Sequence, residues 1–339
     1  MTLTQGIALA VCLTCLSGCK PAESDYQSYL ERLQNVLDIK APLAQSQSPQ
    51  FPAKRSLKQT TQASTLSIRE FLSLRQCKIH VTIAHRNSLI GKVANDSQLL
   101  VNDLEILIHG PACLNTLEPS PLKQKLAEFL KQKEQAINTS LWNAIIADDE
   151  FQQFWRNTGK HQNYPKQLPA ETVNDLLNVT QLIETIIKRD YETAFKLSIR
   201  LEQYLGNIRF GDGGLLVYEY SQLLESMVAA NQLLETALKQ PLCLNKAPNI
   251  KAKYFHNVVN KFFINQVQSR SVLLEQRKRQ LLPAIVALES SLIGQAPKSF
   301  LDWQKLRDKK LNANLELTKH AQLIQKLFAQ CGLNAGAPA

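Results

Sequence analysis

The chain has 339 residues, of which 44% are hydrophobic and 20% are charged, and its formal net charge is +10 at pH 7. This apolar content excludes an intrinsically disordered chain and is sufficient for a sizeable core. Only 12 glycines among abundant leucines, glutamines, lysines and alanines favour helices over a β-rich fold.

The first 19 residues have the pattern of a bacterial lipoprotein signal. The apolar run 7–16 has the length of a secretory signal's apolar region and is too short for a bilayer, which needs about 20 helical residues. The step at 16–19, Leu-Ser-Gly-Cys, resembles a lipobox. We expect residues 1–18 to be a signal peptide and Cys19 to carry acyl chains such as palmitate, which would hold the chain on a lipid bilayer.

The neighbours of Cys19 refine this expectation. Cys12 and Cys15 are poorer acceptors, because bulky Val11 and Thr14 directly precede them. Residues 1–6 contain no Lys or Arg, although such signals usually begin with positive charge, so an ordinary N-terminal helix is the alternative. By resemblance to other signals, Lys20 after the cysteine indicates the outer membrane rather than the inner one.

A short helix and an extended strap are expected next. Apolar residues at 26, 29/30, 33 and 36/37 repeat every three to four positions and predict a helix with Ser24 as its N-cap. Residues 40–64 contain three prolines among Ser and Gln, which is typical of a strap or linker. We assign residues 19–64 to the anchor, short helix and strap, 65–331 to a helical domain and 332–339 to a flexible tail.

The segment 66–110 carries mixed signals. Apolar residues alternate over 77–83 and 104–108, as they do in strands. We predict two helices instead, because no third strand is available and a two-stranded ribbon is marginally stable. Gly91 is expected to close the first helix, Asp96 or Ser97 to cap the second, and Gly110-Pro111 to end it.

Two stretches resemble a family of predicted lipoproteins of Gram-negative bacteria. The first is REFLSLRQC at 69–77, followed by RNSLIGKV at 86–93 and by Cys113. The second is FHNVVNKFF at 255–263, followed by Val-Gln at 267–268 and Leu-Pro-Ala at 282–284. The resemblance covers about 24–330, and the family is known as domain-of-unknown-function family 3080. It implies lipidation and a helical body, and it implies no activity.

Helical periodicity continues to the end of the chain, with breaks at loops. Pro121 fits the first turn of its helix, a kink is expected at Pro283, and loops are expected at 158–169 and 207–214. The predicted helices are 119–147, a short aromatic helix opened by 148–150, 170–205 with a break near 188–190, 215–239, 252–294 and 299–330.

The cysteines are expected to form two disulfides. An even number of cysteines after Cys19 suggests disulfide pairing in an exported chain. If the helices 252–294 and 299–330 are antiparallel, the end of the second returns to the start of the first and places Cys331 beside Cys243. Cys77 then pairs with Cys113 by elimination. Free buried thiols are the alternative.

Two motifs have both a catalytic or binding interpretation and a structural one. Asp148, Asp149 and Glu150 could provide a general acid and base, but acids at a helix start also offset the macrodipole. The glycine-rich turn 210–214 precedes a helix and could hold an anion, yet it lacks the strand and Lys-Ser/Thr of a P-loop. We favour the structural interpretation of both.

The best candidate for a polar site lies in the segment 85–105. Arg86 and Asn87 end a mostly apolar helix and are expected to face Asp103 and Glu105 in the returning one. A buried arginine–carboxylate pair there would lock two helices together, and a ligand pocket is the alternative. We expect no catalytic residue, metal ligand set or cofactor, because the six histidines lack metal-ligand spacing and no Gly-x-Ser-x-Gly motif is present.

These patterns together predict an all-α protein of antiparallel helical hairpins, packed into one elongated bundle or solenoid-like stack and braced by two disulfides. We expect a lipoprotein on the periplasmic face of a membrane, acting as a non-enzymatic binding or envelope-assembly component with an envelope protein as a partner. The positive charge is spread thinly, so we expect no nucleic-acid partner. An envelope hydrolase that uses the 148–150 acids and a carrier of an apolar ligand are the alternatives.

Overall fold

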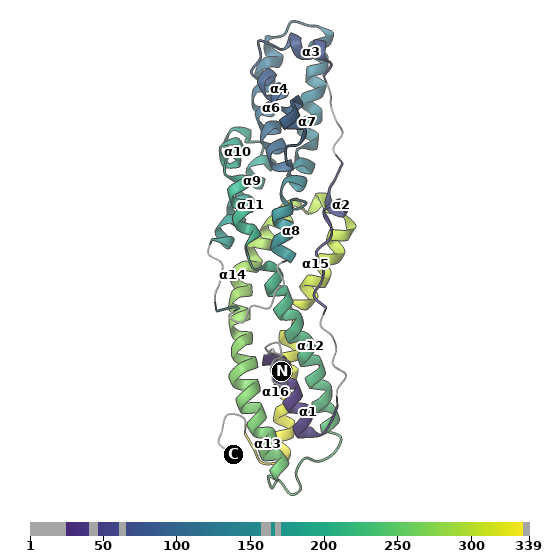
Figure 1. Cartoon of the computed structure of the whole chain (residues 1–339), viewed down its shortest axis with the longest axis vertical. Coiled ribbons are helices and arrows are strands. Elements are labelled where there is room, and N and C mark those ends of the chain that lie inside the picture. Colours follow the sequence, from purple (N-terminus) through teal and green to yellow (C-terminus); the bar gives the residue numbers. More distant parts are fainter. Residues whose placement is uncertain (1–24, 41–46, 61–65, 157–163, 167–170, 335–339) are drawn as a thin grey trace, which may run out of the picture. The chain divides into compact units, whose positions relative to one another are not determined.

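A computed structural model describes the residues 25–40, 47–60, 66–156, 164–166 and 171–334 (Figure 1). Every regular element within these ranges is a helix and none is a strand, so the all-α prediction is confirmed. The predicted signal peptide, Cys19 and the N-cap Ser24 lie outside the described residues, as does most of the predicted loop 158–169.

The chain is organised as two compact units. Unit 1 comprises residues 1–44, 226–269 and 316–339, and unit 2 comprises 45–225 and 270–315. The sequence analysis places 65–331 in one helical domain, whereas the contacts divide these residues between the two units.

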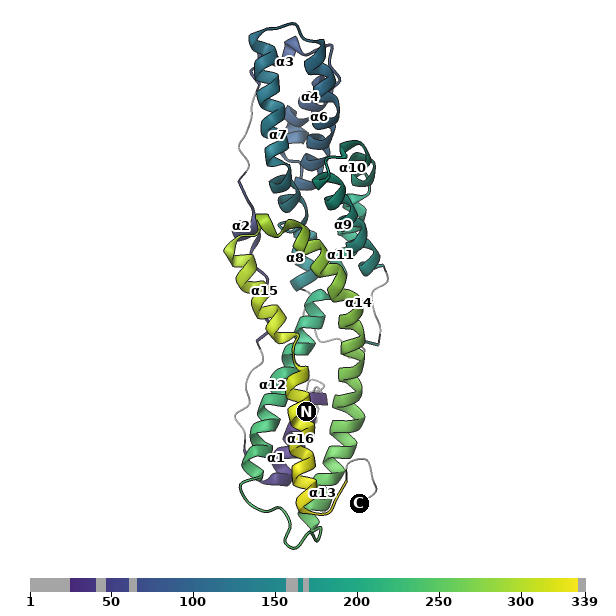
Figure 2. The same cartoon turned by 180° about the vertical axis from the view of Figure 1, so that it is seen from behind.

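Unit 1 is a bundle of helices around an aromatic core. Helix α1 (Asp25–Leu37) packs against α13 (Ile250–Val258) and against the π-helical segment Val259–Gln268 that continues it. The end of α12 (Gly213–Ala237) and α16 (Asn314–Gln330) complete the bundle, as both views show (Figures 1 and 2). The predicted apolar stripe of α1 is confirmed, because all its members except the half-buried Val36 are buried: Tyr26, Tyr29, Leu30, Leu33 and Leu37.

The first part of unit 2 contains the segments 77–83 and 104–108, whose apolar residues alternate as in strands, and all its described regular elements are helices. These are α3 (Ile68–Ser73), α4 (Ile79–Asn87), α5 (Leu89–Lys92), α6 (Asp96–Thr116) and α7 (Pro121–Ile145). Residues 77–83 and 104–108 therefore contain no strand. Pro121 occupies the first turn of α7, as predicted.

Three predicted helix ends in this region are wrong. Asn95 caps α6 by accepting a hydrogen bond from the Gln98 amide at 3.0 Å, and Gly91 lies inside α5. Helix α6 continues through Gly110-Pro111 to Thr116. A Cβ at Gly110 would lie 2.2 Å from Cδ2 of Leu130, so the glycine permits close packing of α6 on α7 instead of ending the helix.

The second part of unit 2 follows the predicted breaks only in part. Its remaining helices are α8 (Asp149–Arg156), α9 (Thr172–Ile187), α10 (Tyr191–Ser198), α11 (Leu201–Arg209), the start of α12, α14 (Ser269–Leu292) and α15 (Lys298–Lys310). The break near 188–190 is confirmed, with Arg189 at a φ of 63°. The predicted loop 207–214 is present but shorter, at residues 210–212, because α11 continues to Arg209 and α12 begins at Gly213. The predicted helix 299–330 is interrupted between α15 and α16.

The described part of the strap, 47–60, is extended apart from the one-turn helix α2 (Lys54–Leu57). It packs against the rest of unit 2 through Phe51, which is 6% exposed. The ring centroid of Phe51 lies 4.7 Å from that of Trp303. Trp142 Nε1 donates to the Leu57 carbonyl at 2.7 Å. The Asn143 side chain pairs with both the amide and the carbonyl of Gln59, each at 2.8 Å.

Both predicted disulfides are present, one in each unit. Cys77 and Cys113 have Cα atoms 5.3 Å apart, and those of Cys243 and Cys331 are 5.1 Å apart, as expected for disulfides. The first joins the turn before α4 to α6, and the second joins the loop after α12 to the residue that follows α16.

Candidate functional site

The predicted polar site in unit 2 is a buried charge cluster centred on Asp103 of α6, which is 3% exposed. Arg86 of α4 forms an ion pair with Asp103. Lys133 of α7 places Nζ 2.8 Å from Asp103 Oδ1, and Ser140 donates to Oδ2 at 3.2 Å. Burial lowers the pKa of Lys133, while Asp103 opposes that shift. The cluster joins three helices through one carboxylate, which is a lock rather than an open site.

The other two predicted members of this site have different positions. Glu105 accepts a hydrogen bond from Thr82 at 2.7 Å, which is a second contact between α4 and α6. Asn87 is exposed and lies outside the cluster. Lys133 and Ser140 were not among the predicted members, although their spacing of seven residues places both on one face of a helix.

The turn 210–214 contains a second buried ion pair. Asp212 is 0% exposed and accepts two hydrogen bonds from Arg277, at 2.8 Å from Nε and 2.6 Å from Nη2. Tyr164 donates to the same carboxylate at 2.9 Å. A Cβ on Gly213 would lie 2.4 Å from the Phe154 ring. The glycines therefore allow the turn to pack closely on Phe154. Arg277 is already bound by the carboxylate of Asp212, so it is not free to bind an external anion.

A third buried pair joins α14 to α15. Glu289 and Arg307 are 0% and 1% exposed, and Arg307 Nη1 lies 2.5 Å from Glu289 Oε1. The guanidinium carbon lies 5.2 Å from the ring centroid of Trp155 and 5.0 Å from that of Trp303, within the range of a cation–π interaction. Burial raises the pKa of Glu289, although Arg307 opposes this shift.

The acidic cluster 148–150 surrounds the start of α8. The Glu150 amide donates to Asp148 Oδ1 at 3.0 Å, and the Asp149 carboxylate lies 2.8 Å from Lys54 Nζ. Burial, together with a hydrogen bond to the Glu150 side chain, raises the pKa of Asp148 to about 7. The arrangement is that of a helix cap, with one carboxyl that titrates near neutral pH.

Unit 1 contains a buried polar chain that the sequence analysis did not predict. The Tyr29 hydroxyl lies 2.7 Å from His320 Nε2, and His320 Nδ1 lies 2.7 Å from Asn231 Oδ1. Since the amide oxygen only accepts, Nδ1 carries the proton and Nε2 accepts from Tyr29. Burial lowers the pKa of His320 to about 3. These hydrogen bonds could not be predicted from the sequence, because a single histidine inside an amphipathic helix does not indicate its partners.

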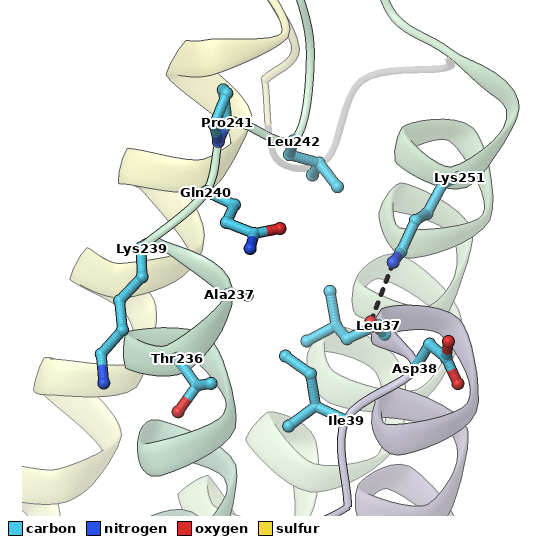
Figure 3. A pocket seen from close by; sticks show the side chains of 10 residues that line it. All are labelled: Leu37, Asp38, Ile39, Thr236, Ala237, Lys239, Gln240, Pro241, Leu242 and Lys251. Atoms are coloured by element: carbon cyan, nitrogen blue, oxygen red, sulfur yellow. Dashed lines mark hydrogen bonds between the residues drawn. The ribbon is translucent and has the colours of Figure 1, made fainter.

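Unit 1 also has a pocket of about 430 Å³ between the ends of α1 and α12 and the start of α13 (Figure 3). Leu37, Ile39 and Leu242 form its apolar wall, and the Gln240 amide points into it. Lys251 Nζ donates to the Leu37 carbonyl at 2.8 Å. A second cavity, of about 750 Å³, lies against α3 in unit 2 and is lined by Ile68, Arg69, Leu72, Ser73, Arg75 and Gln76. None of the predicted site residues lines either of them.

A comparison with protein families tests the resemblance seen at 69–77 and 255–263. The family model described as protein of unknown function, DUF3080, matches residues 26–335. The chain belongs to the DUF3080 family. No curated protein and no solved structure gives a significant match.

The buried ion pairs of this DUF3080 protein differ from the polar groups of its pocket in unit 1. The buried carboxylates Asp103, Asp212 and Glu289 each bind a cation from another helix. The polar groups of the pocket in unit 1 are accessible instead. Over the described ranges, no three His, Cys, Asp or Glu side chains are grouped so as to hold a metal, and no helix there has the length and apolarity to cross a membrane.

Proposed function

We propose that this DUF3080 protein is a lipoprotein, held by acyl chains on Cys19 on the periplasmic face of a membrane, the outer one rather than the inner. There it acts as a non-enzymatic binding or envelope-assembly component. The observation that supports this most is the state of the cysteines. All four cysteines after Cys19 pair with one another, which is typical of exported proteins. If residues 1–18, which contain Cys12 and Cys15, are removed as a signal peptide, Cys19 is the odd cysteine that remains, and it stands at the end of the lipobox-like step.

The buried charges support a role in binding or assembly more than in catalysis. The buried carboxylates of Asp103, Asp212 and Glu289 are each bound by a cation from another helix, so they hold the fold together and are closed to a substrate. The pocket of unit 1 contains Asp38, Gln240 and Lys251, and this polar lining does not fit a carrier of an apolar ligand.

One observation favours the hydrolase alternative. The pKa of Asp148, raised to about 7 by burial, is suitable for acid–base catalysis at neutral pH. Its carboxylate, however, already accepts the Glu150 amide at the helix start, and residues 148–150 line neither cavity. We therefore rank this function second. Loss of an envelope hydrolytic activity in Asp148→Asn, with normal disulfides, would reverse that ranking.

Metabolic labelling with palmitate tests the anchor. We expect label in the wild-type chain and none in Cys19→Ser. Cys15→Ser is the matched control, because it removes a cysteine of the same signal region and should keep the label. Equal labelling of wild type and Cys19→Ser, or no label in either, contradicts the proposal.

Thiol alkylation in intact cells tests the compartment. An exported chain should give no alkylation of the four paired cysteines until a reductant is added. Alkylation of all four without reductant would place the chain in a reducing compartment and contradict an exported role.

A further inference from the structure

The loop end of unit 1 has a concentration of positive charge with almost no acid. The chain has no acidic residue between Glu235 and Glu275, and five lysines lie in that interval. Four of them belong to or flank the loop between α12 and α13 and are exposed: Lys239, Lys246, Lys251 and Lys253. No ion pair joins any of these four to a described residue. Asp38, after α1, is the acid that lines the pocket at this end.

Large apolar side chains are exposed among these lysines. Leu244 is 75% exposed, Ile250 72% and Tyr254 60%. Ile250 and Tyr254 are four residues apart on α13 and therefore share a face of the helix, with Lys253 beside them. We call this set, Leu244, Lys246, Ile250, Lys253 and Tyr254, the basic end of unit 1.

The basic end is held in a fixed shape. Cys243 is bonded to Cys331 at the end of α16, and the Leu242 amide donates to Gln330 at 2.9 Å. Asn249 spans the loop by donating to the Leu242 carbonyl at 2.8 Å. Asn245 and Lys246 have φ values of 55° and 58°, which mark a tight turn at the loop tip. The apolar and basic side chains are therefore presented by a preformed surface.

Interactions with helix C-termini account for the positions of two of the four lysines but not for those of the other two. Lys251 donates to the terminal carbonyl of α1, and Lys239 follows the C-terminus of α12, positions where a cation offsets the macrodipole. Lys246 at the loop tip and Lys253 on α13 have no such role. Their charges face solvent beside exposed aliphatic and tyrosine side chains.

We propose that the basic end of unit 1 docks on a lipid bilayer that carries anionic headgroups. Lysines complement such headgroups, and each one near an anionic surface strengthens binding by roughly fivefold. Exposed aliphatic residues and a tyrosine enter the boundary between headgroups and acyl chains. The setting at a membrane rests on the proposed function, whereas the contact itself needs no acyl chain.

Fluorescence of the full chain on vesicles tests the contact. The three native tryptophans are at most 4% exposed, so the indole added by Tyr254→Trp reports on the basic end alone. On mixed vesicles of phosphatidylcholine and phosphatidylglycerol we expect a blue shift of its emission and quenching by brominated lipid. On pure phosphatidylcholine we expect neither. Leu244→Trp in the loop provides a second reporter if the first variant fails to fold.

Charge reversal of Lys246 and Lys253 to Glu in the reporter chain should weaken vesicle binding by at least roughly 25-fold, from two contributions of about fivefold. The matched control reverses the exposed Lys305 and Lys309 of unit 2, gives the same net charge and should leave the quenching unchanged. Equal losses in both variants, equal quenching on neutral vesicles, or no quenching at all would overturn the proposal.

This experiment and the labelling of Cys19 fail independently. Quenching on anionic vesicles without palmitate on Cys19 would keep the docking surface and refute the lipid anchor. Label on Cys19 without quenching would keep the anchor and refute the docking surface.

Discussion

Units 1 and 2 satisfy their buried polar groups by different chemistry. Unit 1 has a buried chain of three neutral side chains, Tyr29, His320 and Asn231, at its centre, and Asn231 also donates to the half-buried Glu316 carboxylate at 2.8 Å. Unit 2 contains full charges, of which Arg307 with Glu289 and Arg277 with Asp212 are the most deeply buried. Removing one member of an ion pair leaves an uncompensated charge, whereas removing one member of a neutral chain leaves an unpaired dipole. The two units should therefore differ in how they respond to substitution and to pH.

The largest effect is expected from Arg307→Met in unit 2. It leaves Glu289 fully buried without its cation, and loss of one partner of such a pair costs about 3–5 kcal/mol. Tryptophan fluorescence during urea denaturation measures the change, since all three tryptophans belong to unit 2. Arg307→Met combined with Glu289→Leu should restore much of the stability. A double variant no better than the single one would contradict the view that the unpaired charge is the cause.

Removal of one disulfide comes next in size and compares the units directly. Each bond should contribute about 2–4 kcal/mol. The bond in unit 1 closes a separation of 88 residues and the bond in unit 2 one of 36. The loop-entropy account then predicts that Cys243→Ser with Cys331→Ser costs more than Cys77→Ser with Cys113→Ser, by less than about 1 kcal/mol. Hydrogen exchange of α16 and α6 peptides measures both losses, and a larger loss in unit 2 would refute that account.

The sequence is most informative where a signal is local. The stripe of α1, the first-turn Pro121 and the break before α10 were all predictable, because each depends on periodicity, on the proline ring or on a capping side chain such as that of Asp190. Gly110 shows the limit of such signals. Gly-Pro is a helix terminator by local rules, but here the glycine accommodates Leu130 of another helix. Tertiary packing overrides the local preference.

The candidate sites depend on partners that are distant in the sequence. Arg86 and Asp103 are 17 residues apart and were found together, whereas Lys133 comes from α7. His320 and Tyr29 are separated by 291 residues, and no pattern within either helix points to the other. The helix geometry that predicts the pairing of Cys243 with Cys331 succeeded because it uses only helix length and direction.

Acidification should destabilise unit 1 through His320. Burial lowers the pKa of His320 to about 3, so between the ordinary value of about 6.5 and 3 the unfolded chain takes up a proton that the folded unit does not. Stability is therefore fully present above the ordinary pKa and falls by up to about 1.4 kcal/mol per pH unit below it. Hydrogen exchange of α1 and α16 at pH 7 and 5 should show a loss of about 2 kcal/mol.

His320→Gln is the control for this pH effect. The amide can hydrogen-bond but does not titrate in this range, so the variant should be less stable at pH 7 yet show a smaller further loss at pH 5. An unchanged pH slope in His320→Gln would assign the effect to another group.

Asp148 should give unit 2 the smallest effect, and one of opposite sign. Burial and Glu150 raise the pKa of Asp148 to about 7, so between about 3.8 and 7 the folded unit binds a proton that the unfolded chain has lost. Stability from this group is present at low pH and is lost as pH rises through 7. Because the Glu150 amide and Lys54 favour the ionised form and oppose the effect of burial, we expect a change of only about 1 kcal/mol. Fluorescence-monitored urea denaturation of Asp148→Asn, which keeps a capping side chain, should show a flatter profile from pH 5 to 7. A profile that matches wild type would show that the carboxyl is ionised in the folded unit, and the contrast in pH response would then rest on His320 alone.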